Sequence, residues 1–422
     1  MRIVKLAAVL WIIGAVCGLA ACGVEEGGSQ TAVSAPEPAK ERELTLQEVE
    51  RLDEKTAEAE PVHFAYVYAT LSEGEKRWYA DILHSLETME ETTRLSEEGL
   101  ELGLTESSVD PVFQSVLHDH PELFYVEGYH YTKYMHGDRI VAVDFSGTFS
   151  ADAETVSEKN AQIEQALQQI LRDAPTGMDD YSKIKYAYEV IIEQTDYDTE
   201  APDNQNIYSV FVGHRSVCQG YAKAFQYLME RMGIMCVLVQ GTVRDTGEGH
   251  AWDLVRSNGA FYYVDTTWGD ISYQSAERAE AGEEPAFAQI SYDYLCINTE
   301  QLLRTHEIDP ALELPQYTAT ADNYYVREGA FFTAYDRDQL EALVERSLAA
   351  GEKDVYVTDA GENGRMLSLR CADRACYEEM CRALLDEREF FDYLAGTGID
   401  SFVYATNDEQ YTLTFFMVTS IP

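Results

Sequence analysis

Three residues in one stretch have the side chains that a thiol-based acyl-transfer site requires: Cys218, His250 and Asp265. A cysteine nucleophile needs a base to accept its proton, and that base needs a third group to hold its ring in the right tautomer. All three residues lie between Ser209 and Asp270. Their types predict covalent catalysis on a carbonyl group, provided that the surrounding elements bring them together.

The segment around Cys218 has the pattern of a helix start. Ser216 and Gln219 have the spacing of a capping box, which predicts a helix beginning near Val217. Gly233 marks its end. Apolar side chains recur between these points at helical spacing: Tyr221, Ala222, Phe225, Leu228, Met229 and Met232. Cys218 is therefore expected in the first turn, where unpaired N–H groups and the helix dipole favour a thiolate.

Three strand-like runs follow this helix, over residues 234–243, 250–256 and 260–266. The last two are separated by Asn258-Gly259, a dipeptide that strongly favours a two-residue hairpin turn. The sequence therefore predicts an antiparallel hairpin after the helix.

The hairpin fixes which side chains share a face. If Asn258 and Gly259 form the loop, Ser257 pairs with Ala260, and counting back places Trp252 opposite Asp265. His250 lies on the same face as Trp252 because side chains alternate along a strand. Asp265 is then a diagonal neighbour of His250, within reach of a side-chain hydrogen bond.

The motifs at these positions resemble the core of the transglutaminase-like (transglutaminase/protease) superfamily. They are Cys-Gln-Gly-Tyr-Ala at 218–222, Gly241 followed by His250-Ala251-Trp252, and Tyr-Val-Asp-Thr-Thr-Trp at 263–268. The resemblance implies an α+β, papain-like core with the cysteine at a helix N-terminus and the His and Asp on adjacent antiparallel strands. Carried over, Cys218 is the nucleophile and supplies one oxyanion donor through its backbone N–H. His250 is the general base and acid, Asp265 orients it, and no cofactor is needed.

Other residues in the stretch have alternative roles. His214 lies four residues before Cys218 and competes for the role of base, but the hairpin offers it no orienting partner, so we place it in a loop or lining the site. Trp252 and Trp268 either pack inside the fold or line the substrate cleft, and the sequence does not decide between these roles.

The charge balance disfavours some classes of partner, and the N-terminus indicates export. The chain has 31 basic and 75 acidic residues, a net charge of −44, which disfavours binding to nucleic acid or anionic lipid. Residues 1–22 read as a signal peptide, with a basic start, an apolar stretch and Leu-Ala-Ala-Cys, which resembles a bacterial lipobox. The resemblance implies that Cys22 is lipidated and anchors the protein to the outside of the cell membrane. Residues 23–45 read as a flexible tether.

The rest of the chain is divided into three expected regions. Residues 46–150 form an N-terminal helical and β region, 151–310 the catalytic domain, and 317–422 a C-terminal α+β module with a mostly antiparallel sheet. Helices are expected over 152–172 and 179–195 from their apolar periodicity.

Metal and disulfide sites have weaker support. His118, Asp119 and His120 form one short cluster, and a metal-dependent hydrolase built on His118 and His120 is the third functional reading. We favour a helix end there and expect no metal. No cysteines have CxxC spacing, and a disulfide among the last three stays open: Cys371, Cys376 and Cys381.

The expected function is acyl transfer or hydrolysis on protein or peptide amides, cell-wall peptides among them, through a thioester on Cys218. The sequence does not separate an amine acceptor from water, since the same three residues serve both reactions. The rival from another class is a non-catalytic surface scaffold that retains an enzyme fold.

Overall fold

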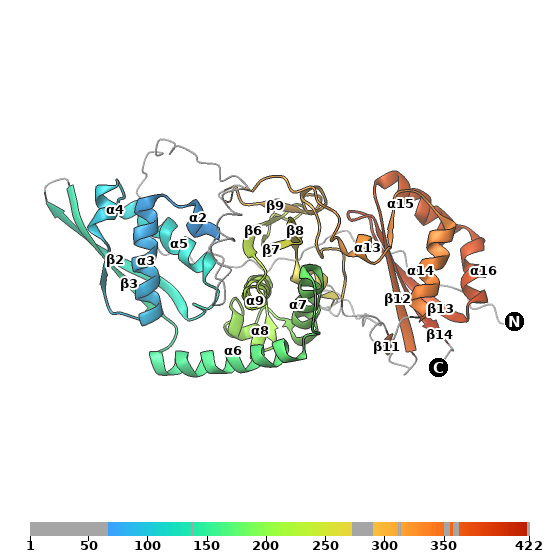
Figure 1. The fold of residues 1–422 in the computed structure, drawn as a ribbon, viewed down its shortest axis with the longest axis horizontal. Coiled ribbons are helices and arrows are strands. Elements are labelled where there is room, and N and C mark those ends of the chain that lie inside the picture. Colours follow the sequence, from blue (N-terminus) through green and yellow to red (C-terminus); the bar gives the residue numbers. More distant parts are fainter. Residues whose placement is uncertain are drawn as a thin grey trace. The chain divides into compact units, whose positions relative to one another are not determined.

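The computed structural model describes residues 66–136, 139–271, 290–310, 312, 314–349, 355–357 and 363–419 (Figure 1). The chain forms two compact units, and each is built from separate segments. The first unit comprises residues 66–177 and 199–238, and the second comprises 178–198 and 239–419. Across the described ranges, none of the helices combines the length and the apolar character needed to cross a membrane.

The first unit is mainly helical with one small sheet. Its helices are α2 (Tyr66–Thr70), α3 (Glu73–Thr88), α4 (Glu97–Glu101), α5 (Val109–Asp119), α6 (Ala153–Asp173), α8 (Ile207–Phe211) and α9 (Cys218–Arg231), with a 3-10 turn over Glu106–Ser108. Its strands are β1 (Thr93–Arg94), β2 (Val126–His136), β3 (Arg139–Phe149) and β5 (Arg215–Ser216). The predicted helix over 152–172 is confirmed as α6, which Asp152 caps by accepting from the Thr155 N–H.

The sheet of the first unit has the order β1-β3-β2, with both pairings antiparallel. Helix α3 contacts β3 as well as α4 and α5, and it carries a buried stripe of Trp78, Ile82 and Leu86. A capping box between Ser72 and Glu75 fixes where α3 begins.

The second unit contains two sheets. The elements before its C-terminal part are α7 (Asp180–Gln194), β4 (Asp196–Tyr197), most of β6 (Cys236–Val243), β7 (Gly249–Ser257), β8 (Ala260–Val264), α10 (Thr266–Gly269), α12 (Thr299–Leu302) and β9 (His306–Ile308). The four-stranded sheet has the order β8-β7-β6-β9, and the printed pairs β7–β8 and β6–β9 are antiparallel. The predicted helix over 179–195 is confirmed as α7.

The predicted hairpin is also confirmed. Ser257 pairs with Ala260, and Asn258 and Gly259 have φ values of 48° and 85°, the left-handed pair that a type I′ turn requires. The ladder runs back to Asp253 opposite Val264, where β8 ends. The register therefore follows the one that the turn dictates.

The C-terminal part of the second unit is an α+β layer structure with its own apolar core. Its elements are α13 (Tyr324–Arg327), β10 (Phe331–Phe332), α14 (Arg337–Ala349), β11 (Val355–Val357), β12 (Asn363–Cys371), α15 (Arg374–Cys381), a π-helical turn (Arg382–Asp386), α16 (Arg388–Gly396), β13 (Ile399–Asn407) and β14 (Thr412–Thr419). Its sheet is antiparallel except for the short β10–β12 pair. The α+β class predicted for the chain is confirmed.

Candidate active site

Cys218 is the first residue of α9, one residue later than the start that the capping pattern predicts. Its side chain is buried, with 7% of its surface exposed, and it is a free thiol. The predicted side-chain cap is wrong: Val217 occupies the N-cap position and no side chain caps the helix. The first-turn placement of Cys218 is nevertheless confirmed, because the helical periodicity from Tyr221 onward sets the start independently of the cap.

Ser216 has a different role from the one predicted. Its hydroxyl lies 2.7 Å from the Ser209 hydroxyl and donates to the Asn204 carbonyl over 2.8 Å. These contacts link the residues just before α9 to the preceding loop. A Cβ atom at Gly220 would lie 2.0 Å from the Ser216 Oγ and 3.0 Å from the Asn204 carbonyl oxygen. The glycine two residues after Cys218 is therefore required by this close approach.

At the other end, α9 terminates as predicted. Gly233 has φ 75°, its N–H bonds the Glu230 carbonyl, and the Ile234 N–H bonds the Met229 carbonyl. These two bonds form a Schellman motif, which satisfies carbonyl groups at the helix end.

His250 and Asp265 are joined as the hairpin register predicts. The His250 Nε2 atom lies 2.7 Å from Oδ2 of Asp265, and both side chains are buried, with 8% and 1% of their surfaces exposed. The other carboxylate oxygen, Oδ1, accepts from the Trp268 N–H over 3.0 Å and so caps α10. This second bond holds the carboxylate in a fixed orientation toward His250.

A third residue, His306, reaches the same carboxylate and was not predicted from the sequence. Its Nε2 atom lies 3.1 Å from Oδ2 of Asp265, and its ring is completely buried. Its Nδ1 atom lies 2.8 Å from the Thr305 hydroxyl. His306 begins β9, which pairs with β6 at Val243, so the sheet brings it to the site from 41 residues away.

The electrostatics of this cluster favour an ionised aspartate beside a neutral second histidine. Burial would raise the pKa of the Asp265 carboxyl, but His250, followed by His306, outweighs it and holds that pKa well below its usual range. Burial also lowers the pKa of His306, and Asp265 opposes this only in part. A neutral His306 that donates from Nε2 has an acceptor at Nδ1, which the Thr305 hydroxyl can satisfy.

Aromatic rings surround the cluster. Trp252 is completely buried, with its ring centre 5.8 Å from that of His250 and 4.8 Å from that of His306. Trp268 is only partly buried, and its ring centre lies 5.7 Å from His250 and 4.6 Å from His306. The burial of Trp252 favours the packing role that the sequence left open, while the partial exposure of Trp268 leaves it able to contact a ligand.

Gly241 explains how β9 comes close enough to deliver His306. A Cβ atom at this position would lie 2.0 Å from the Glu307 carbonyl oxygen and 2.7 Å from the Trp252 ring. The absence of a side chain lets β6 approach both the neighbouring strand and the buried indole.

The sequence also singled out residues outside this cluster. His214 is an exposed residue with φ 54° in the loop before β5. Cys22, together with the predicted signal peptide and tether, lies outside the described residues. Among the residues that are described, Cys371, Cys376 and Cys381 are free thiols.

The His118–His120 cluster does not converge. Asp119 accepts hydrogen bonds from the Val67 and Tyr68 N–H groups, and His120 contacts Glu122 through Nδ1 at 2.8 Å. Asp119 and His120 therefore face different neighbours.

His250, Asp265 and His306 form the one group in the described part of the chain whose ligand atoms could hold a metal ion, all within 4.8 Å of one another. Both imidazole Nε2 atoms, however, point to the same carboxylate oxygen at hydrogen-bond distance. A metal ion would have to replace both bonds, so the geometry fits a hydrogen-bonded cluster better than a metal site.

Residues 165–266 match the family model of the transglutaminase-like superfamily, a range that includes Cys218, His250 and Asp265. The chain is 25% identical over 134 residues to kyphoscoliosis peptidase of Mus musculus, an alignment that covers 28% of this chain and 20% of that protein. It thus spans about a fifth of the length of this curated relative.

Two solved structures are similar in part. One is a TGase, with a TM-score of 0.25 and 14% identity over 33% of this chain and 45% of that chain. Another is a candidate cysteine protease from Cytophaga hutchinsonii, with a TM-score of 0.23 and 10% identity over 34% of this chain and 66% of that chain. On the match of residues 165–266 and the motifs within them, the chain contains a domain of the transglutaminase-like superfamily.

Proposed function

We propose that this chain is a cysteine enzyme that transfers or hydrolyses the acyl groups of protein or peptide amides. Cys218 is the nucleophile, His250 the general base and acid, and Asp265 the residue that orients His250. The observation that carries the proposal is the buried 2.7 Å contact between His250 Nε2 and Asp265 Oδ2. A carboxylate in this position fixes the tautomer and orientation of a catalytic imidazole.

The proposed reaction has two steps. Because Nε2 of His250 faces Asp265, Nδ1 is the ring nitrogen that accepts the Cys218 thiol proton. The thiolate attacks the amide carbonyl, the C–N bond breaks, and the imidazolium returns the proton to the leaving amine, which leaves a thioester. Water or an amine then attacks the thioester, its proton passes to His250 and on to the sulfur, and the free thiol is regenerated.

The comparisons support both outcomes of the second step. The relative named a peptidase favours water as the acceptor, whereas the name of the matched family favours an amine. The two reactions share every residue of the proposed set, so only the products separate them.

The test compares the purified full chain in detergent with its Cys218→Ala and Cys381→Ala variants. Each is incubated with a glutamine-containing protein and a labelled primary amine, and mass spectrometry follows incorporation, deamidation and cleavage. Cys381 is the matched control because it is a partly exposed free thiol outside the proposed set. We expect product formation that is lost in Cys218→Ala and kept in Cys381→Ala.

Amine incorporation would establish an acyltransferase, and cleavage or deamidation alone would establish a hydrolase. Activity that survives in a folded Cys218→Ala variant would refute the proposed nucleophile. A Cys218 thiol that fails to react with iodoacetamide at neutral pH would favour the non-catalytic scaffold instead.

We also propose export and lipid anchoring through Cys22, on the Leu-Ala-Ala-Cys motif. Metabolic labelling of bacteria with a fatty-acid analogue should label the full chain but not the Cys22→Ala variant. Equal labelling of both would contradict the proposed anchor.

A further inference from the structure

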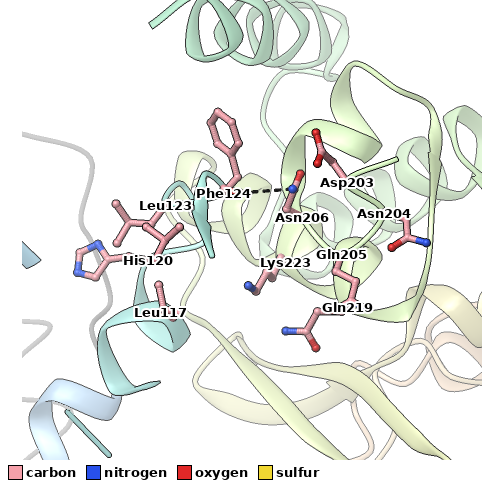
Figure 2. A pocket seen from close by; sticks show the side chains of 11 residues that line it. Leu117, His120, Leu123, Phe124, Asp203, Asn204, Gln205, Asn206, Gln219 and Lys223 are labelled. Carbon is pink, nitrogen blue, oxygen red and sulfur yellow. Dashed lines mark hydrogen bonds between the residues drawn. The ribbon is translucent and has the colours of Figure 1, made fainter. Parts of the chain in front are cut away.

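A pocket of about 320 Å³ lies in the first unit, beside the helix that begins with Cys218. Three segments line it: the end of α5 with the residues that follow, the loop before α8, and one face of α9 (Figure 2). From α9, Gln219 and Lys223 extend into the pocket, and they lie on the same face because they are four residues apart.

Lys223 is the unusual residue of this pocket. Its side chain is partly buried, and within the described ranges its ammonium group has no hydrogen-bond or ion-pair partner. Burial lowers the pKa of Lys223 to about 8, so the amine remains largely protonated at neutral pH. A partly desolvated ammonium group without a counter-ion is less stable than one in water, and a bound anion would offset part of that cost.

The other charged groups at the pocket are already neutralised. The Asp203 carboxylate forms an ion pair with Lys159 over 3.0 Å, and His120 contacts Glu122 at 2.8 Å. The charge that remains uncompensated in the pocket is therefore the positive charge of Lys223. This is notable in a chain with a net charge of −44, where acidic groups outnumber basic ones by more than two to one.

The other side chains that line the pocket indicate the chemistry of the rest of the ligand. Leu117, Leu123 and Phe124 supply an apolar wall, and the side chains of Gln205 and Gln219 line the polar side (Figure 2). One cation neutralises a monocarboxylate one to one, whereas a phosphate dianion would retain excess charge inside an acidic protein. Amide side chains and an apolar wall suit a peptide with hydrocarbon side chains.

We propose that this pocket binds a carboxylate of a peptide, with Lys223 as its counter-ion and Gln219 beside it. The carboxylate comes either from the C-terminus of the peptide or from an acidic side chain, since both present the same group.

If the proposed function also holds, the pocket binds a carboxylate of the substrate, since Lys223 lies five residues beyond Cys218 on the same helix. This second part of the inference depends on Cys218 being the nucleophile.

Binding is tested with three peptides: acetyl-Leu-Gln-Ala-Leu with a free C-terminus, the same peptide as its C-terminal amide, and acetyl-Leu-Gln-Ala-Glu as its amide. Calorimetry uses the full chain carrying Cys218→Ala, so catalysis plays no part. The free acid should bind roughly 10- to 100-fold more tightly than its amide, the range expected for a charge-assisted hydrogen bond. Comparable binding of the Glu peptide would identify an acidic side chain as a second source.

The variants Lys223→Met and Lys223→Arg are compared in the same background, with Lys76→Met as the matched control. Lys76 pairs with Glu73 on α3 and does not line the pocket. Lys223→Met should abolish the preference for the acid, Lys223→Arg should keep most of it, and Lys76→Met should leave it unchanged. Circular dichroism confirms that each variant is folded.

Three outcomes would overturn the pocket proposal. They are equal binding of the acid and the amide, no binding of the acid, and a preference for the acid that persists in folded Lys223→Met. The catalytic proposal is tested separately by Cys218-dependent product formation. A catalytically inert chain that still prefers the acid would refute only the function. An active enzyme with equal KM for the acid and amide peptides, and equal binding of both, would refute only the pocket.

Discussion

His306 lies against Asp265, with its Nε2 atom 3.1 Å from Oδ2, the oxygen that also accepts from His250. We interpret His306 as a positioning residue, because its buried ring fixes the carboxylate that orients the proposed base. It has no proposed contact with the reacting atoms.

Replacing His306 by alanine should lower kcat about 10-fold with little change in KM, since a hydrogen bond to a charged group is lost. The acid limb of the pH profile should move to higher pH, because a carboxylate with one donor fewer stabilises the His250 imidazolium more strongly. In His306→Gln, which retains an N–H donor, kcat should fall less than in His306→Ala. A pH profile identical to that of the parent would reduce His306 to a packing role.

Gly220→Ala should destabilise the protein by about 1–3 kcal/mol, although alanine normally favours a helix. The added Cβ would lie 2.0 Å from the Ser216 Oγ. The double variant Ser216→Ala/Gly220→Ala should recover part of the loss. Urea unfolding measures both, with Gly396→Ala in α16 as the control, because a Cβ there meets nothing within 4 Å. Equal stability of the Gly220 and Gly396 variants would contradict this account.

His118→Leu should reduce the acid sensitivity of folding. Burial, followed by the charge of Lys223, lowers the pKa of His118 to about 4, against roughly 6.5 in an unfolded chain. The unfolded state therefore binds more protons between pH 6.5 and 4, and stability falls as the pH falls through that window. Between pH 7 and 4, the loss in the free energy of unfolding should be about 1–3 kcal/mol smaller in the variant than in the parent. Urea unfolding at both pH values measures this, with the exposed His130→Leu as the comparison variant.

Lys223→Met should raise the stability of the ligand-free chain at pH 7 by about 1–2 kcal/mol, because it removes a partly buried unpaired charge. Burial lowers the pKa of Lys223 to about 8, so the unfolded state binds more protons between pH 8 and the usual lysine value. The stability of the parent should rise through that window, and the variant should lack the rise. Thermal melts of both proteins at pH 7 and 9.5 test this. A Tm of Lys223→Met below that of the parent at pH 7 would contradict the unpaired charge.

Removal of metal ions should leave Cys218-dependent activity unchanged, whereas added Zn²⁺ should inhibit it. Zinc that bound His250, Asp265 and His306 would displace the hydrogen bonds that orient the proposed base. The measurement is activity after dialysis against a chelator and after stepwise addition of zinc. Loss of activity on chelation, with recovery on addition of metal, would instead establish a metal centre.

Local patterns predicted much of the fold around the site. Asn258-Gly259 specifies its turn through backbone geometry alone, and that turn fixes the register that brings His250 to Asp265. Helices α6 and α7 follow from apolar periodicity and from their capping residues, Asp152 and Asp179.

Long-range contacts account for what local patterns could not predict. Ser216 has the spacing of a cap, yet Ser209 and Asn204 hold its hydroxyl, so a tertiary contact overrides the local preference. His306 has no motif of its own and reaches Asp265 only because β9 pairs with β6. The signal that could have revealed it is a histidine near the end of the predicted catalytic domain, residues 151–310.

The interleaving of the two units sets an order for biosynthesis. Helix α7 belongs to the second unit, but the first unit is not complete until Leu238 has been made. When α7 leaves the ribosome, the strands that share its unit do not yet exist. Its apolar face, formed by Ile184, Tyr188, Ile191 and Ile192, must wait for at least the β7–β8 hairpin before it can be buried. Slow translation or truncation between residues 195 and 265 should therefore expose this face to chaperones and proteases.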